Sequence, residues 1–429
     1  MRMPSLKFFL RSLIPGVFLA LTACGGGGGG GGPTVPPQTC NVLSVPPTPI
    51  PTPFTPASSS TLNHVPVTVE QYASVNYPTM NLPYVTVQVC HGSQCVSIDH
   101  VIVDTGSYGL RVRADFPGIS ALNLPAVTNG TVPVTECAQF LGGYMWGGVY
   151  QATVKVGGET TANPIPIQLV GGQYPFTPPG SCTSNAGTDI GNLDGIGGNG
   201  LLGVGVFLHD LSPYYACASS PNTGSGNLAL TSVVFNPVAA FSTDNNGVVL
   251  NLSAVNSAGQ PTASGTLTFG INTQPNNSLT TSYSVLPVPA SGPDIGDFTA
   301  SLTGQSGTYP DSFFDSGSNL YFIPLTGVPT NSNGDYNPQT LTTITGTATS
   351  FVNSSNTASL SFGLLDISSG LSNGDRAFND SGTSNGATAG SADFGLPYFY
   401  GHSIINGLNG AQVTQGSTSS FTGPFYAIQ

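Results

Sequence analysis

Two segments of the sequence, half a chain apart, each place an aspartate directly after an apolar run. The first is IVDTGSYGL at Ile102–Leu110, which contains Asp104, and the second is FFDSGSNLYFIP at Phe313–Pro324, which contains Asp315. An ionised carboxylate at the end of a buried strand is unfavourable unless its oxygens accept hydrogen bonds. In each segment the three residues after the aspartate can donate such bonds: Thr105, Gly106 and Ser107 in the first, Ser316, Gly317 and Ser318 in the second.

Paired carboxylates suit general acid–base chemistry, in which one group accepts a proton and the other donates one. Two carboxyl groups at close range cannot both ionise readily, so the pair keeps one proton over a wide pH range. The ionised member can take a proton from a water molecule while the protonated member donates to a carbonyl oxygen, and no covalent intermediate is needed. The sequence leaves open whether Asp104 or Asp315 is the base, because a coupled pair titrates as a unit.

The simpler interpretation of both segments is a turn. An Asp-x-Gly triplet in a chain rich in Gly and Ser usually marks one, and this is the favoured interpretation of either segment alone. However, the two aspartates stand 211 positions apart, and each is followed later by an apolar segment around a Gly. These segments are GNGLLGVGVF at Gly198–Phe207 and DFGLPYFYGHSII at Asp393–Ile405. The repeated layout favours a paired site over two separate turns.

This repeat resembles the pepsin-like aspartic proteases, in which each lobe carries such an aspartate loop and an apolar–apolar–Gly segment crosses behind it. The matching residues are Asp104-Thr105-Gly106-Ser107, Asp315-Ser316-Gly317-Ser318, Leu201-Leu202-Gly203 and Phe394-Gly395. The resemblance covers roughly residues 80 to 405 and is also shared with an uncharacterised branch of bacterial lipoproteins. It implies a bilobal double-β-barrel fold with a cleft between the lobes, catalysis by Asp104 and Asp315, and a polypeptide substrate.

The resemblance also implies a flap, a hairpin that closes over the cleft. Its second strand looks like VYQATVKVGG at Val149–Gly158, and the preceding CAQFLGGYMWGG offers two aromatic residues for its tip. We expect Tyr144 in that role, with Phe140 as the alternative. Arg111 stands where many relatives carry a Trp near the base of the flap.

The composition predicts an all-β fold to position these residues. Charged residues make up only 6% of the chain, while Gly (57) and Pro (36) are abundant. Short Val, Thr, Tyr and Phe runs between Gly, Pro and Asn clusters are typical of strands and turns. We expect an N-terminal β lobe at 61–240 and a C-terminal β lobe at 241–429, each with one aspartate loop.

The N-terminal residues predict export and anchoring. Residues 1–23 have a basic start and an apolar centre, and LTAC then resembles a bacterial lipobox ending at Cys24. We expect a lipidated Cys24 and a Gly- and Pro-rich disordered tether at 24–60. Gly25 is not acidic, which by resemblance indicates the outer membrane of a Gram-negative cell envelope. The alternative is an ordinary signal peptide that happens to contain a Cys.

The net charge of the chain disfavours one class of binding partner, and its cysteines predict a disulfide. Loss of residues 1–23 would leave four bases against 19 acids, a net charge of −15, which disfavours nucleic acid. We expect a monomer with no cofactor and no metal.

Cys90 and Cys95 flank a short turn between two strand-like runs and are the expected disulfide. The pairing of the other cysteines stays open: Cys40, Cys137, Cys182 and Cys217.

The favoured function is a membrane-anchored aspartic endopeptidase, a hydrolase of the cell envelope. A fold can persist after its catalysis is lost. The alternative is therefore a catalytically silent binding or adhesion lipoprotein on the same fold. A purely structural envelope lipoprotein is the third possibility.

Overall fold

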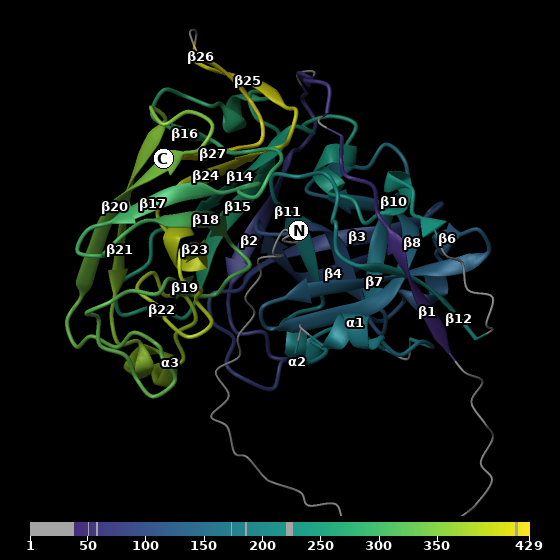
Figure 1. Ribbon diagram of the computed structural model, residues 1–429, viewed down its shortest axis with the longest axis horizontal. Helices are drawn as coiled ribbons and strands as arrows, with labels where there is room; N and C mark the ends of the chain where they lie inside the picture. The colour runs from purple at the N-terminus through teal and green to yellow at the C-terminus, as the bar shows by residue number, and fades with distance from the viewer. Residues whose placement is uncertain are drawn as a thin grey trace, which may run out of the picture.

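The computed structural model describes residues 38–49, 51–56, 59–172, 174–184, 187–219, 226–416 and 419–429, in which β-strands are by far the commonest regular structure (Figure 1). The strands of the first half are β1 (Thr39–Ser44), β2 (His64–Val69), β3 (Pro83–His91), β4 (Gln94–Asp104), β5 (Tyr108–Arg113), β6 (Thr128–Asn129), β7 (Val132–Phe140), β8 (Gly143–Val156), β9 (Glu159–Thr160), β10 (Ile165–Val170), β11 (Gly200–Val204), β12 (Tyr214–Ala218) and β13 (Gly226–Asn227). The strands of the second half are β14 (Gly247–Leu252), β15 (Ala263–Phe269), β16 (Ser284–Pro287), β17 (Phe298–Leu302), β18 (Tyr309–Asp315), β19 (Tyr321–Phe322), β20 (Thr342–Ser350), β21 (Thr357–Leu364), β22 (Gly382–Thr383), β23 (Ser391–Gly395), β24 (Ser403–Gly407), β25 (Gln412–Gln415), β26 (Ser419–Thr422) and β27 (Phe425–Ile428).

Helices are short and few among the described residues. They are α1 (Gly180–Thr183), α2 (Leu193–Ile196) and α3 (Ser368–Asn373), with 3₁₀ turns at Ser120–Leu122, Leu230–Ser232, Pro237–Ala240, Pro275–Asn277 and Leu396–Phe399. The expectation of an all-β fold is confirmed. The reason is compositional, since Gly, Pro and β-branched residues disfavour long helices.

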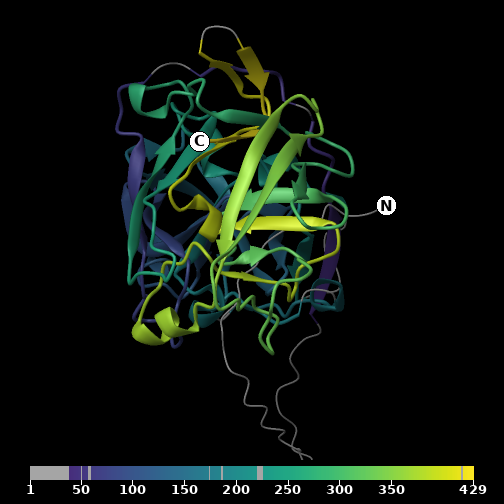
Figure 2. The ribbon, with the colours of Figure 1, turned by 90° about the vertical axis from the view of Figure 1, so that its left-hand side faces the viewer.

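The two halves of the chain lie side by side, the first half on the right of Figure 1 and the second on the left. One large sheet contains 18 strands, and a separate seven-stranded sheet has the order β21-β20-β17-β18-β23-β19-β22. In the view turned by 90°, the long β20–β21 pair of that second sheet faces the viewer (Figure 2). Strands β25 and β26 form a separate hairpin.

The large sheet crosses from one half to the other. Strand β2 pairs with β3 of the first half and also with β15 of the second, where Val67 lies opposite Gly265. From β15 the sheet continues through β14, β24 and β27 to β16. The two halves therefore share a continuous backbone hydrogen-bond network rather than only a packed interface.

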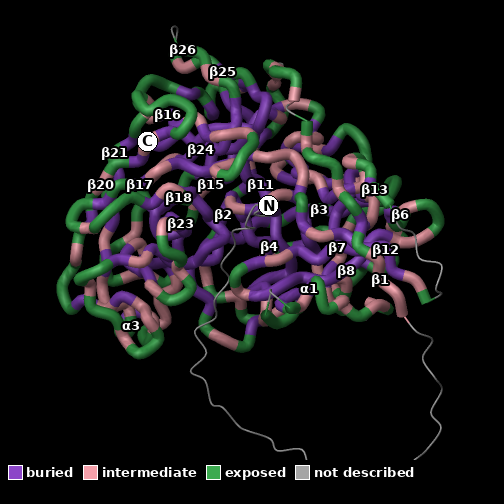
Figure 3. The backbone as a smooth tube through the Cα atoms, in the orientation of Figure 1, coloured by how far each residue is buried: buried purple, intermediate pink, exposed green. Residues whose placement is uncertain are grey.

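Burial follows the strands and leaves the loops exposed (Figure 3). In β4 the burial pattern alternates at first, and then all four residues from Val101 to Asp104 are buried. A strand buried on both faces needs an apolar run, which VIV supplies. The aspartate that ends this run therefore lies inside the protein.

The prediction of a disordered tether at 24–60 is wrong for the described part of that range. Thr39–Ser44 forms β1, which pairs antiparallel with β12, and a disulfide joins Cys40 to Cys217. Further along, Phe54 exchanges backbone hydrogen bonds with Gly410 and Gln412 of the second half. A Pro-rich composition favours extended backbone, and here that backbone is paired with other strands. The expected signal at 1–23 and Cys24 lie outside the described residues.

The expected Cys90–Cys95 disulfide is present at the turn between β3 and β4. The remaining cysteines form Cys40–Cys217 and Cys137–Cys182. All three bridges lie in the first half of the chain. No helix within the described ranges is long and apolar enough to span a membrane.

Candidate functional site

Each aspartate ends a strand that lies parallel to a later strand of its own half. Asp104 ends β4 and lies opposite Gly203 of β11, and Asp315 ends β18 and lies opposite Gly395 of β23. A Cβ atom on Gly203 would lie 2.6 Å from the backbone nitrogen of Tyr108, and one on Gly395 would lie 2.1 Å from a backbone oxygen. Only glycine allows these strands to cross so close behind the loops, which explains why both apolar segments contain one.

The first loop holds its aspartate with three donors. The backbone N–H groups of Gly106 and Ser107 donate to Asp104 Oδ1 at 2.8 and 3.1 Å. The Ser107 hydroxyl donates to Asp104 Oδ2. All three bonds favour the ionised carboxylate.

The second loop repeats this arrangement and adds a third carboxyl group. Gly317 donates its N–H to Asp315 Oδ1 at 2.8 Å, and Ser318 Oγ lies 3.0 Å from Asp315 Oδ2. The same hydroxyl lies 2.6 Å from Asp393 Oδ2 on β23. A serine hydroxyl has one proton to donate. Ser318 can therefore donate to only one of these two carboxyl groups at a time.

The two loops are tied to each other by four reciprocal hydrogen bonds. The Thr105 hydroxyl accepts from the N–H of Ser316 (2.9 Å) and donates to the carbonyl of Phe314 (3.1 Å). The Ser316 hydroxyl accepts from the N–H of Thr105 (3.1 Å) and donates to the carbonyl of Val103 (2.8 Å). This exchange fixes the two loops face to face.

The structure brings the two aspartates together. A Cβ atom on Gly106, in the first loop, would lie 2.5 Å from Asp315 Cγ in the second, and each aspartate perturbs the pKa of the other. Both residues are 0% exposed. Burial, and next the negative charge of Asp315, raises the pKa of Asp104 well above its usual range. Burial also raises the pKa of Asp315, opposed by the hydrogen bonds from Asp104 and Gly317. The pair therefore retains a proton where ordinary aspartates are ionised.

Full burial means that solvent does not reach the pair in this structure. A cavity of about 280 Å³ lies elsewhere, beside β3 and β8, with Lys155 and Glu159 among its lining residues. Access of a water molecule or substrate to the aspartates therefore requires movement of the surrounding segments. In the part of the chain that the structure describes, no three His, Cys, Asp or Glu side chains are grouped to hold a metal ion.

The hairpin expected to act as a flap is formed by β7 and β8, and Phe140 pairs with Gly143 beside its turn. Tyr144 exchanges backbone hydrogen bonds with Thr188 and Ile190, and its side chain packs in a cluster with the Cys137–Cys182 disulfide. The Phe140 ring lies 5.7 Å from the guanidinium carbon of Arg111. The flap role of Tyr144 and of Phe140 stays a prediction.

Two supporting charges were not identified as site residues from the sequence. In the sequence Asp393 is only the first residue of an apolar segment, and Arg111 is only a departure from a family pattern. A signal was available for both, since each is an ionisable residue with an apolar residue on either side, Leu110 and Val112 for Arg111 and Ala392 and Phe394 for Asp393. Such residues are rarely buried without a specific partner.

The comparisons with known proteins identify a family without assigning an activity. A search of curated proteins found no match for the sequence. Residues 59–428 match the family model described as "Protein of unknown function (DUF3443)". Because this match spans most of the 429 residues, the chain belongs to the DUF3443 family.

Proposed function

We propose that this protein is an aspartic endopeptidase, with Asp104 and Asp315 as its catalytic pair, on a bilobal pepsin-like double-β-barrel fold. One observation carries the proposal: two buried carboxyl groups lie on loops that the Thr105–Ser316 exchange holds face to face. The repeated crossing of β11 and β23 behind the loops supports the proposed fold.

The proposed reaction needs one proton on the pair. The ionised aspartate accepts a proton from a water molecule, and the resulting nucleophile attacks a peptide carbonyl. The other aspartate donates its proton to the carbonyl oxygen, so the tetrahedral intermediate is neutral. Because burial favours the singly protonated pair, this state extends toward less acidic pH than for two solvated carboxylates.

The proposed setting is the cell envelope. The sequence before residue 38 supports export, lipidation of Cys24 and anchoring, by its resemblance to a lipoprotein signal. The proposed substrate is an extended polypeptide, and the acidic chain disfavours nucleic acid as a partner.

The test is digestion of an unfolded protein at acid pH, with and without a statyl peptide that mimics the tetrahedral intermediate. We expect peptide release that the inhibitor blocks and that Asp104→Asn abolishes. Asp311→Asn is the matched control, because Asp311 is an exposed aspartate on the same strand as Asp315. An inhibitor-insensitive digest, or none from the folded wild-type protein, would overturn the proposal.

One observation favours a second candidate, the catalytically silent binding or adhesion lipoprotein. Asp104 and Asp315 are both fully buried, so neither is presented to a substrate without a conformational change. A folded wild-type protein that releases no peptide while the two carboxyl groups still share a proton would support this candidate.

A further inference from the structure

A second buried group of charges lies beside the first aspartate loop. Arg111 on β5 forms ion pairs with Glu136 of β7, at 2.9 Å, and with Asp210, and all three side chains are 0% exposed. Tyr214 donates its hydroxyl to Glu136 Oε1 at 3.1 Å, and Ser212 donates to Asp210 Oδ1 with its N–H and its hydroxyl. We call Arg111, Glu136 and Asp210 the arginine cluster.

The arginine cluster joins the aspartate loop to the β7–β8 hairpin. Gln168 of β10 donates to the backbone carbonyls of Glu136 (2.9 Å) and Met145 (3.2 Å), which stand on the two strands of that hairpin. Glu136 also comes from the hairpin, whereas Asp210 follows β11, the strand that crosses behind the loop. Three segments, those of Arg111, Glu136 and Asp210, therefore meet at one guanidinium group, and Gln168 ties the Glu136 strand to the other strand of the hairpin.

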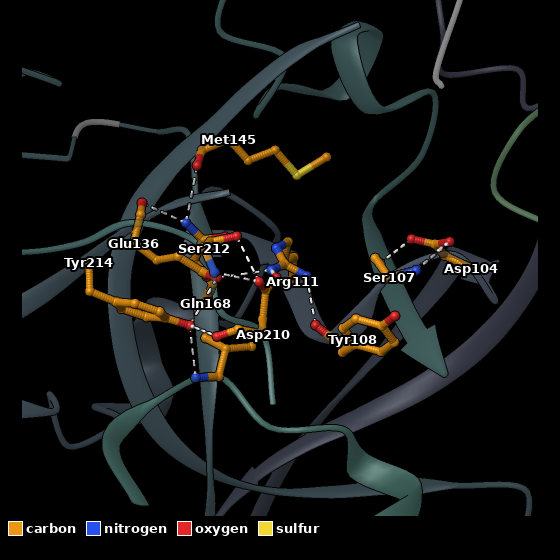
Figure 4. Close-up of polar contacts among 11 residues, drawn as sticks. Asp104, Ser107, Tyr108, Arg111, Glu136, Met145, Gln168, Asp210, Ser212 and Tyr214 are labelled. Carbon is orange, nitrogen blue, oxygen red and sulfur yellow. Dashed lines mark hydrogen bonds and ion pairs between the residues drawn. The ribbon is translucent and has the colours of Figure 1, made fainter. Parts of the chain in front are cut away.

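A continuous chain of contacts leads from this guanidinium to the dyad (Figure 4). Arg111 Nη1 donates to the carbonyl of Tyr108 at 3.0 Å. The preceding residue is Ser107, which donates both its N–H and its hydroxyl to Asp104. The two-residue segment Ser107–Tyr108 is thus held by Arg111 at the Tyr108 carbonyl and donates to Asp104 through the N–H and hydroxyl of Ser107.

Stability alone does not account for the arginine cluster. Arg111 Nε, Glu136 Oε2 and Gln168 Oε1 are buried without a hydrogen-bond partner in the described chain. Each such atom costs about 1–3 kcal/mol, and a buried ion cluster is often no more stabilising than apolar residues. The second half of the chain has an equivalent position. Arg111 lies opposite Leu201, two residues before the crossing Gly203. In the same way, Phe322 lies opposite Asp393, two residues before the crossing Gly395. Phe322 fills that position with an apolar ring.

We propose that Arg111, held by Glu136 and Asp210, is a positioning residue that fixes the segment Ser107–Tyr108 against Asp104 and couples the dyad to the β7–β8 hairpin. Its effect on catalysis rests on the proposed function, whereas its effect on the Asp104 carboxyl group does not. Without Arg111 at the Tyr108 carbonyl, the Ser107 donors move away from Asp104. Because those donors favour the ionised carboxylate, their loss raises the pH at which the pair gives up its last proton.

The test uses Arg111→Lys, which keeps a positive charge for the two carboxylates but has a single nitrogen in place of the planar fork. Isotope-edited infrared spectroscopy of the carboxylic-acid C=O stretch follows the proton on the dyad, with Asp104→Asn identifying the band. We expect the variant to fold and its dyad to release the last proton at higher pH than the wild type. We also expect kcat to fall about 10- to 100-fold with little change in KM, as misplacement of a catalytic group predicts.

The control is Arg113→Lys, since Arg113 lies two residues further along β5 and pairs with Asp115 at the surface. If Arg111→Lys fails to fold, the triple variant Arg111→Met, Glu136→Gln, Asp210→Asn leaves no unpaired charge and gives the same readout. An unchanged dyad titration in a folded variant would overturn the proposal. If the wild type releases no peptide, the proposed function fails, and the infrared titration still decides the role of Arg111.

Discussion

The loop after Asp104 and the loop after Asp315 share a backbone plan but differ in the buried charge that supports them. Both aspartates end a strand, accept bonds from a Gly and a Ser, and have a glycine crossing behind them. In the first half the buried charge is Arg111, on the strand that leaves the loop. In the second it is Asp393, on the strand that crosses behind it.

This difference affects the two aspartates in opposite ways. Arg111 acts at a distance, through the Tyr108 carbonyl and Ser107. Asp393 competes directly with Asp315 for the one hydroxyl proton of Ser318. The two aspartates of the dyad are thus identical residues with different hydrogen-bonding environments. This difference gives a physical basis for unequal proton affinities within the dyad.

The largest expected effect is the loss of either aspartate. Asp104→Asn and Asp315→Asn should each lower kcat by roughly 10²–10⁴-fold or more, because an amide cannot share the proton. The double variant should lose about as much as each single variant, since the two groups act as one unit. Steady-state kinetics at acid pH measures this, and losses that multiply in the double variant would show two independent groups.

The next largest effect concerns the reciprocal tie between the loops. Thr105→Val leaves the N–H of Ser316 without its acceptor, and Ser316→Ala does the same to the N–H of Thr105. Each should lower the free energy of unfolding by about 1–3 kcal/mol. Urea denaturation measures both, and a loss in only one variant would mean that the tie is not symmetric.

A smaller effect is expected from the third carboxyl group. In Asp393→Asn the amide can donate to Ser318 Oγ, which frees the Ser318 proton for Asp315. Because that bond favours ionised Asp315, the pH profile of kcat/KM should shift toward acid. Leu201→Met is the matched control, since Leu201 is the register equivalent of Asp393 in the first half. A shift toward alkaline pH would contradict this role.

The smallest effect concerns stability at the junction between the two halves. Burial, and next the charge of Asp244, raises the pKa of Glu159 to about 7 from an ordinary value of 4.5. The folded protein holds this proton more tightly than the unfolded chain, so its stabilising effect is complete below 4.5 and is lost as pH rises to about 7. Glu159→Gln should reduce that loss. Thermal unfolding across this pH range measures it, and an unchanged slope would rule out Glu159 as its source.

The aspartate loops and their crossing glycines could be predicted because both depend on local sequence. A carboxylate after an apolar run needs adjacent donors, and a close strand crossing needs a Gly. The role of Thr39–Ser44 could not be predicted in the same way, because its partner strand and Cys217 are distant in sequence. The arginine cluster also depends on distant partners, since Glu136 lies 25 residues and Asp210 lies 99 residues from Arg111.

The most direct test of the account is a count of protons on the dyad as a function of pH, by the same isotope-edited infrared method. We predict two separate steps for the wild type, with the last proton held well above the ordinary aspartate pKa of about 3.9. Asp104→Asn should replace them with a single step from Asp315. Two carboxyl groups that ionise together near the ordinary value, with no effect of either substitution on the other, would contradict the shared proton on which the proposed function depends.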